Sequence, residues 1–348
     1  MLESINLSLA SICGANCIFC PSNRGQRIKQ KVMPFECVKK IIDEISSEKF
    51  KKKHNVKRLE LGENGDAFLN KDLIKILRYI KEQTPKLRVA LSTNFQNFTK
   101  EKAEIILRED LVDSFTCNID GSDNQNYFEV KKLTLNRTKI NLFTFLKLRK
   151  ELKSKASLRI LVLTLNNYIQ TIHNNFKFYP TKLKDPKLRK IPDDFKAIKK
   201  QISRKLGPKD RIVRSWVFAW AERGKIDPKT LNYKKYVCPN LLRIKREAFI
   251  APDGTWYLCC LDSDNELVIG NVMNQTLDEI FHSEKRKKII DMLARKEFGK
   301  IGGPCKTVNC CYIMHKRPLL SRVARTIFKN EFLLKLATKK SSSIDLET

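Results

Sequence analysis

The segment SICGANCIFCP, residues 11–21, places Cys13, Cys17 and Cys20 in a CxxxCxxC spacing. It follows directly on the apolar run 5–10, which is typical of a short buried strand. Three thiolates can hold three of the four irons of a cubic 4Fe-4S cluster and leave the fourth iron without a protein ligand. We therefore expect a reactive metal centre in the loop that follows the first strand.

The composition is that of a folded protein in a reducing compartment. Hydrophobic residues make up 42% of the 348 residues, which is enough for an ordinary core. The N-terminus lacks a basic stretch followed by an apolar one, and no run approaches the roughly 20 apolar residues of a membrane span. Most of the 11 cysteines fall in two groups, which favours metal ligation over disulfides. We expect a cytoplasmic protein.

The chain is strongly basic. It has 69 Lys and Arg against 38 Asp and Glu, a formal net charge of +31, which attracts polyanions such as RNA, anionic lipids or phosphorylated metabolites. The densest basic stretch, residues 177–214, has 14 Lys or Arg against four Asp but lacks the interleaved aromatic residues of a base-stacking platform. A solvated basic surface is therefore favoured over nucleic-acid binding.

The first two thirds of the chain alternate strand-like and helix-like patterns, as parallel strands joined by crossover helices do. The expected strands are residues 5–10, 57–61, 87–93, 114–119, 157–163 and 211–220. The expected helices lie near residues 35–45, 73–80, 100–108, 141–152 and 195–206, the second of them capped by Asn70. We predict the α/β class, as a partial (β/α)6 TIM-like barrel that binds ligands at the C-terminal strand ends.

Three regions are expected along the chain. Residues 1–226 form the partial barrel, and residues 227–315, with short strands, Gly turns and closely spaced Cys, form a small C-terminal Cys-rich α+β domain. Residues 316–348 are predicted to be a basic amphipathic helix with a polar tail. This helix either packs on the body or frays, or it contacts a membrane surface.

Several segments in order along residues 1–165 resemble the radical S-adenosylmethionine (radical SAM) superfamily. They are the cysteine triad with Phe19 before its last Cys, Gly62-Glu63 at the end of the second strand, Ser92-Thr93-Asn94 at the end of the third and Asn118-Ile-Asp120-Gly121 at the end of the fourth. The sequence departs from the family at Phe95, where members normally have Gly, and residues 161–166 lack the Gly-x-Ile-x-Gly motif. A zinc knuckle is the alternative for the triad, but residues 21–33 offer no fourth His or Cys ligand.

The resemblance implies a 4Fe-4S cluster on Cys13, Cys17 and Cys20 that binds S-adenosylmethionine and cleaves it by one-electron reduction. The 5'-deoxyadenosyl radical then takes a hydrogen atom from the substrate. The implied cofactor contacts are Glu63 to the methionine ammonium, Gly62 for close backbone approach, Thr93 or Asn94 to the carboxylate or ribose, Phe19 beside the adenine, and Asn118 and Asp120 after the fourth strand.

A second cysteine group resembles the auxiliary-cluster module called SPASM or its short form, twitch. It contains Cys238-Pro239, a Gly254 turn separated by four residues from Cys259-Cys260, and a closing group Cys305, Cys310 and Cys311. A 4Fe-4S cluster fully held by thiolates needs four of these six. We predict Cys238, Cys259, Cys305 and Cys310 as ligands, with Cys260 and Cys311 as substitutes and a structural zinc as the alternative. Cys37 and Cys117 are interpreted as packing residues, and the four His residues show no ligand spacing.

These observations predict a radical SAM enzyme acting on a small polar metabolite, such as a sugar or cyclitol, or on a peptide. The triad begins at residue 13, which favours the small molecule slightly. A flavodoxin- or ferredoxin-type protein is the expected electron donor. The alternative is a non-catalytic Fe-S or zinc protein that binds nucleic acid through its basic surface.

Overall fold

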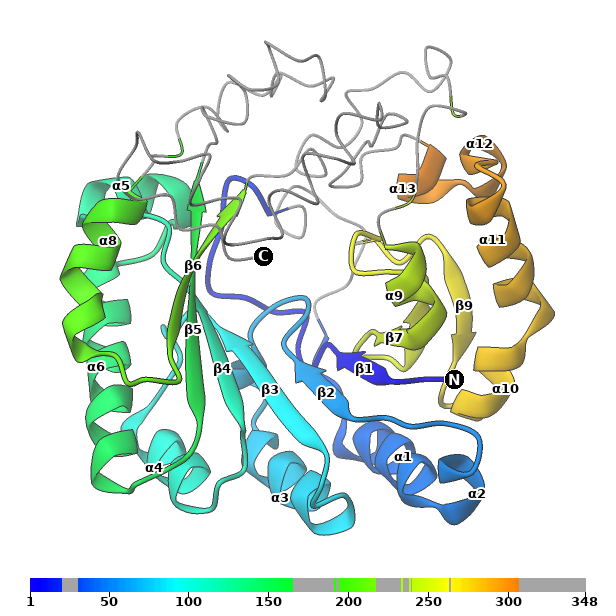
Figure 1. Cartoon of the computed structure of the whole chain (residues 1–348), viewed down its shortest axis with the longest axis horizontal. Helices are drawn as coiled ribbons and strands as arrows, with labels where there is room; N and C mark the ends of the chain where they lie inside the picture. Colours follow the sequence, from blue (N-terminus) through cyan, green and yellow to red (C-terminus); the bar gives the residue numbers. More distant parts are fainter. Residues whose placement is uncertain are drawn as a thin grey trace, which may run out of the picture.

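A nine-stranded sheet forms the centre of the computed structural model, which describes residues 1–20, 31–164, 191, 194–216, 233, 238, 240–262 and 264–306. The strand order is β6-β5-β4-β3-β2-β1-β7-β8-β9. The sheet curves, and α1, α3, α4, α6 and α8 lie along its outer side (Figure 1). This is the open, partial barrel predicted from the alternating pattern.

All strand pairs from β6 through β1 to β7 are parallel, whereas β7-β8 and β8-β9 are antiparallel. The strands lie within two residues of their predicted starts, but β1 is shorter than predicted and β6 is described only to Trp216. The strands are β1 Ser4–Leu7, β2 Arg58–Leu61, β3 Arg88–Thr93, β4 Ser114–Asn118, β5 Ser157–Thr164, β6 Arg211–Trp216, β7 Glu247–Ile250, β8 Thr255–Tyr257 and β9 Val268–Asn271.

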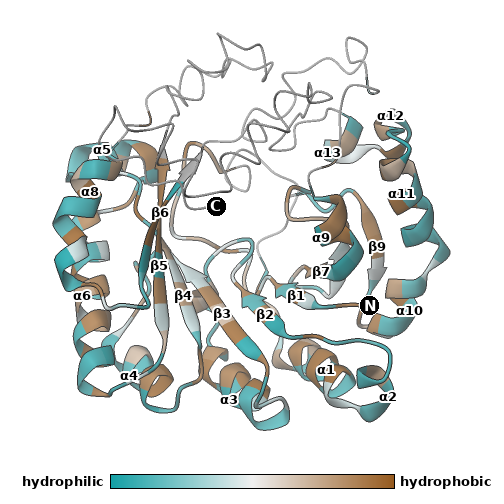
Figure 2. Ribbon diagram, in the orientation of Figure 1, coloured by the Kyte–Doolittle hydropathy of each residue, from teal (hydrophilic) through white to brown (hydrophobic). Residues whose placement is uncertain are grey.

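Helices α1, α3, α4 and α8 are amphipathic and bury one apolar face each, as the mixed colours of α1 and α3 illustrate in Figure 2. In α1, for example, Val38, Ile41 and Ile45 are buried together. The helices are α1 Phe35–Ser46, α2 Glu48–Lys51, η2 Ala67–Leu69, α3 Leu73–Gln83, α4 Lys100–Arg108, α5 Asn124–Lys131, α6 Leu135–Glu151, α8 Phe195–Ile202, η4 Ser203–Lys205, α9 Leu241–Arg246, α10 Leu277–His282, α11 Glu284–Ala294, α12 Phe298–Ile301 and α13 Gly303–Lys306.

Strand β7 places the C-terminal region in the same sheet as the barrel. It runs parallel to β1, with Ser4 opposite Glu247 and Leu7 opposite Ile250. Gly254, at φ 79°, forms the predicted hairpin turn between β7 and β8. The predicted boundaries at 226/227 and 315/316 stay predictions, and residues 316–348 lie outside the described ranges. Within the described ranges, no helix has both the length and the apolar character needed to cross a bilayer.

Candidate active site

The segment that carries the cysteine triad, residues 8–20, leaves the end of β1 and is held at the C-terminal ends of the strands; we call it the cysteine loop. The amide of Asp66 donates to the carbonyl of Ile12 at 2.9 Å. Further along, the amide of Asn16 donates to the carbonyl of Lys131, the last residue of α5, at 3.0 Å. These two hydrogen bonds anchor the loop after β2 and on α5.

The structure brings the three triad thiols into mutual electrostatic contact. Cys17 is buried, while Cys13 and Cys20 are half-buried, and the amide of Cys20 closes a turn on the carbonyl of Cys17 at 3.1 Å. Burial raises the pKa of Cys13 and raises that of Cys17 to about 12. Metal loading must therefore displace thiol protons, as is usual for thiolate sites. Thiolates are soft ligands, and three of them clustered in a partly enclosed loop fit an iron-sulfur cluster.

The turn Gly62–Asp66 fits tightly against two neighbouring backbones. A Cβ at Gly65, which has φ 95°, would lie 2.1 Å from the carbonyl oxygen of Ala10. A Cβ at Gly62, which has φ 98°, would lie 2.6 Å from that of Ser92. Both positions need glycine because of conformation and space, and Gly65 is the contact on which the cysteine loop lies.

Asp66 was not among the predicted site residues, yet it joins the cysteine loop to the turn after β3. Its side chain is buried and accepts hydrogen bonds from the hydroxyl of Thr93 at 3.2 Å and from the amide nitrogen of Phe68 at 3.1 Å. Burial raises its pKa. Its sequence signal is its position three residues after Glu63, at the end of the segment Gly62–Asp66.

Glu63 is half-buried, and no hydrogen bond to its carboxylate is found within the described residues. Burial raises its pKa to about 7, and the guanidinium of Arg243 partly opposes this rise. The charge of Glu63 raises the pKa of Tyr257 and of Cys260, two residues of the C-terminal region. Glu63 is thus an available acceptor for a cationic group, in the turn that holds the cysteine loop and within electrostatic reach of Cys260.

Thr93 ends β3 and Asn94 follows it, next to the triad. The side-chain amide of Asn94 lies 3.6 Å from the sulfur of Cys13, and its Oδ1 accepts the amide of Gln96 at 2.8 Å. The hydroxyl of Thr93 already serves Asp66. Both predicted residues therefore lie at the site, with Thr93 engaged in holding it together.

Asn118 and Asp120, after β4, surround the buried ammonium group of Lys131. Nζ of Lys131 lies 2.9 Å from Oδ2 of Asp120 and 3.0 Å from the carbonyl oxygen of Asn118. Oδ1 of Asp120 accepts the amide of Leu163 on β5 at 2.8 Å. Both carboxylate oxygens of Asp120 are thus occupied by protein groups. Phe19, predicted beside the adenine, packs at this end of the sheet against the small cluster that includes Val130 and Leu163.

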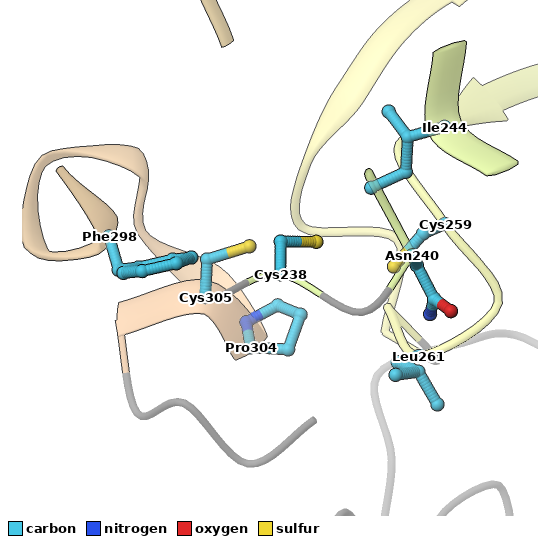
Figure 3. Close-up of a pocket in the computed structure, with 8 residues that line it drawn as sticks. All are labelled: Cys238, Asn240, Ile244, Cys259, Leu261, Phe298, Pro304 and Cys305. Atoms are coloured by element: carbon cyan, nitrogen blue, oxygen red, sulfur yellow. The ribbon is translucent and has the colours of Figure 1, made fainter. Parts of the chain in front are cut away.

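Three predicted ligands of the second cysteine group line one cavity. Cys238, Cys259 and Cys305 come from three separate segments, and Figure 3 shows them around this cavity beside Phe298 and Pro304. Burial raises the pKa of Cys238 to about 11, and burial together with the neighbouring thiols Cys260, Cys305 and Cys238 raises that of Cys259 further. This donor set suits a thiolate-bound metal centre.

Cys260 does not line this cavity. Its sulfur accepts Nη1 of Arg243 at 3.5 Å and Nδ2 of Asn240 at 3.8 Å instead. The predicted ligand Cys310 and its alternative Cys311 lie outside the described residues. Cys37 and Cys117, predicted to be packing residues, are 1% and 0% exposed in the core.

A third group of metal-capable side chains, His54, Asp278 and His282, comes together although the sequence spacing gave no sign of it. The amide of Leu2 donates to Nδ1 of His54 at 3.1 Å, so the imidazole proton sits on Nε2 and faces Oδ1 of Asp278 at 2.9 Å. Nε2 cannot bind a metal unless this proton moves to Nδ1, where the Leu2 amide already donates. The group is therefore a hydrogen-bonded contact between elements.

Two parts of the chain match known families. Residues 7–172 match the Radical SAM superfamily, and residues 238–312 match SPASM, an iron-sulfur cluster-binding domain. The chain belongs to the radical SAM superfamily. The radical SAM match implies a 4Fe-4S cluster and S-adenosylmethionine, and the SPASM match implies an auxiliary Fe-S centre. The chain is therefore an enzyme, not the non-catalytic protein considered as an alternative. None of the curated proteins matches the chain.

Solved structures of other radical SAM enzymes share the fold. BtrN in complex with AdoMet and 2-DOIA is 14% identical with a TM-score of 0.50, covering 90% of this chain and 98% of its own. Streptococcus suis SuiB bound to the precursor peptide SuiA is 16% identical with a TM-score of 0.53, covering 83% and 67%. Native anSMEcpe with bound AdoMet and Kp18Cys peptide is 14% identical with a TM-score of 0.56, covering 97% and 100%.

Proposed function

We propose that this radical SAM enzyme holds its 4Fe-4S cluster on Cys13, Cys17 and Cys20 and abstracts a hydrogen atom from a small polar metabolite or a peptide. When bound, the cluster supplies the electron that cleaves S-adenosylmethionine to a 5'-deoxyadenosyl radical. Cys238, Cys259 and Cys305, with Cys310 as the fourth ligand, hold an auxiliary 4Fe-4S cluster. Among the structural neighbours, SuiB and anSMEcpe carry peptides and BtrN carries 2-DOIA, so both substrate classes suit the fold.

One observation carries the proposal: an acceptor for a cation lies in the turn that holds the cysteine loop. Glu63 projects from the end of β2 next to the anchored cysteine loop, with no hydrogen bond found to its carboxylate within the described residues. A methionine ammonium would supply the charge that such a half-buried carboxylate lacks. Gly62 and the side chain of Asn94 supply a close backbone and a polar group at the same strand ends.

The decisive experiment measures 5'-deoxyadenosine formed from S-adenosylmethionine by anaerobically reconstituted protein with dithionite. The wild-type chain is expected to form it, and Cys17→Ala is expected to form none. Cys37→Ala is the matched control, because Cys37 is an equally buried thiol that faces the α1 core. Activity that persists in Cys17→Ala would refute the assignment of the triad.

The substrate class is tested by label transfer. A deuterated cyclitol or sugar and a deuterated peptide are offered separately, and deuterium is measured in the 5'-deoxyadenosine. The true class transfers its label, and transfer from neither would refute both classes.

The net charge of +31 suits an acidic flavodoxin- or ferredoxin-type donor in the cytoplasm. Flavodoxin-supported turnover is then expected to fall steeply with ionic strength, whereas dithionite-supported turnover changes little. Equal salt dependence of the two would contradict electrostatic docking of the donor.

A further inference from the structure

Lys131 ends α5 and buries a positive charge beneath the cysteine loop. Its side chain is 4% exposed, and that of its partner Asp120 is 0% exposed. Nζ donates to Asp120 Oδ2 at 2.9 Å and to the carbonyl of Asn118 at 3.0 Å. An ammonium group has three N–H donors, and within the described residues only these two hydrogen bonds of Nζ are found. The ring of Tyr127, with its centroid 5.8 Å from Nζ, faces the same ammonium group.

The same helix end holds the backbone on both sides of Cys17. The carbonyl of Lys131 accepts the amide of Asn16 at 3.0 Å, and the carbonyl of Val130 accepts the amide of Ile18 at 2.9 Å. The ammonium group and the Cys17 thiol are therefore fixed relative to each other by one short stretch of chain. A change in the position of α5 would move both together.

The two members of the ion pair are held by different parts of the fold. Lys131 belongs to the helix end that accepts the amides on both sides of Cys17, whereas the second oxygen of Asp120 accepts the amide of Leu163 on β5. The pair is buried, so mobile ions screen it little. The cation of the pair therefore belongs to the segment that holds Cys17, and the anion is tied to the sheet.

We propose that Lys131 is a positioning residue for the N-terminal cluster, holding the cysteine loop around Cys17 while its buried charge favours the reduced state of the cluster. The proposal rests on the proposed function, since it needs a cluster on the triad. Reduction adds one negative charge, which a nearby cation stabilises, and outer-shell charge is one determinant of cluster potential. Asp120 orients the ammonium group and acts on the potential in the opposite sense.

The test is an EPR-monitored redox titration of the anaerobically reconstituted full chain. The N-terminal cluster is identified by the change of its signal on adding S-adenosylmethionine. Lys131→Met is expected to lower the reduced-to-oxidised ratio at a fixed potential about tenfold, which is about 59 mV for a one-electron couple. Asp120→Asn is expected to shift the midpoint the other way, and Lys131→Arg to restore it toward wild type.

Opposite shifts separate an electrostatic role from a merely structural one, which would move both variants alike or leave both unmoved. Lys131→Met leaves a buried carboxylate unpaired and is at risk of misfolding. The double variant Lys131→Met/Asp120→Asn removes both charges and is expected to keep a midpoint more negative than wild type. An unchanged midpoint in the double variant, once it carries its cluster, overturns the proposed role of Lys131 and leaves the proposed function standing. A wild-type triad that loads no cluster overturns the proposed function as well.

Discussion

Phe95 has a glycine-like backbone with a large side chain. It has φ 61°, in the left-handed region, yet its ring is fully buried against Phe98 and Phe145, with centroids 4.8 and 5.7 Å away. The backbone strain is roughly 1–2 kcal/mol, whereas burying the ring is worth about 3–5 kcal/mol. Packing therefore outweighs strain, and the turn that the family normally builds with Gly is kept by an aromatic cluster.

Phe95→Gly and Phe95→Ala are both expected to destabilise the chain, with the Gly variant the more stable by about 1 kcal/mol because it alone relieves the strain. Phe115, fully buried in β4 without a positive φ, is the control, and there Ala should be better than Gly. Urea unfolding of the four variants measures the order. The same order of stability for the Gly and Ala variants at Phe95 and at Phe115 would contradict the strain assigned to Phe95.

Gly65→Ala is expected to remove most of the triad iron, because its Cβ would collide with the carbonyls of Ala10 and Ile12, at 2.1 and 2.7 Å, and displace the cysteine loop. Gly302→Ala is the control: its φ is 88°, but nothing lies within 4 Å of the added carbon. Iron per chain after anaerobic reconstitution is the measurement. Full loading of the Gly65 variant would show that the loop adapts.

Glu63→Gln is expected to weaken S-adenosylmethionine binding about tenfold or more, since a hydrogen bond to a charged group contributes roughly 1.5–3 kcal/mol. The pKa of Glu63 is raised to about 7 by burial, so the wild type should also bind more weakly as pH falls below that value. The Gln variant should lack this dependence. Equilibrium dialysis between pH 6 and pH 8 compares the two, and parallel pH profiles would exclude Glu63 as the acceptor.

At the scale of elements, the sequence predicted those helices whose apolar residues form a regular stripe. It missed α5, which buries only Tyr127, Val130 and Lys131, and one of these carries a charge. It started the following helix at residue 141, whereas α6 begins at Leu135, because the first turn of α6 faces polar partners: Gln96 donates to the hydroxyl of Thr138 at 2.7 Å. A hydrophobic pattern cannot reveal helix faces that bury charges or polar networks.

Asn70 was predicted to cap α3, and its Oδ1 accepts the amide of Asp72 at 2.9 Å, directly before the helix; its side chain also has a second task. Its side-chain amide donates to the carbonyls of Leu9 and Met33, each at 3.0 Å, and so ties the start of the cysteine loop to the segment before α1. The N-cap position belongs to Asp72. Such long-range hydrogen bonds leave no local sequence signal.

Helix α10 docks on α1 and on the end of α2 through a polar contact that should depend on pH. Glu44 accepts the amides of Leu277 and Asp278 at 2.8 and 3.1 Å, and Asp278 pairs with Lys53 and His54. Burial lowers the pKa of His54 below its ordinary 6.5, although Asp278 opposes this. The folded state therefore prefers the neutral ring. The neutral His54 ring therefore contributes fully to the unfolding free energy above pH 6.5, and this contribution is lost as pH falls toward the lowered pKa.

His54→Gln, which is neutral at every pH, should flatten the fall in unfolding free energy between pH 6.5 and pH 5. His282→Gln is the control, because its side chain is 55% exposed. Urea unfolding midpoints of the apo chain measure both. A wild-type-like slope in the His54 variant would assign the pH dependence to other groups.

At the scale of the whole molecule, one sheet carries both cysteine groups. Strand β1, which leads into the triad, lies between β2 and β7, and β8 leads to Cys259. The sequence could give the partial barrel and the hairpin at Gly254, because these follow from local patterns. It could not give the pairing of β1 with β7, which joins residues such as Ser4 and Glu247 across most of the chain.

Separate anchoring of the two thiol groups predicts that the clusters load independently. Wild type should bind about eight irons, Cys259→Ala about four, and Cys260→Ala about eight, since the Cys260 sulfur faces Arg243 and not the cavity. The Cys259 variant should still show an S-adenosylmethionine-dependent EPR change, because the cysteine loop is anchored on Asp66 and Lys131, away from the auxiliary cavity. Iron loss in the Cys260 variant equal to that in the Cys259 variant would make Cys260 a ligand after all.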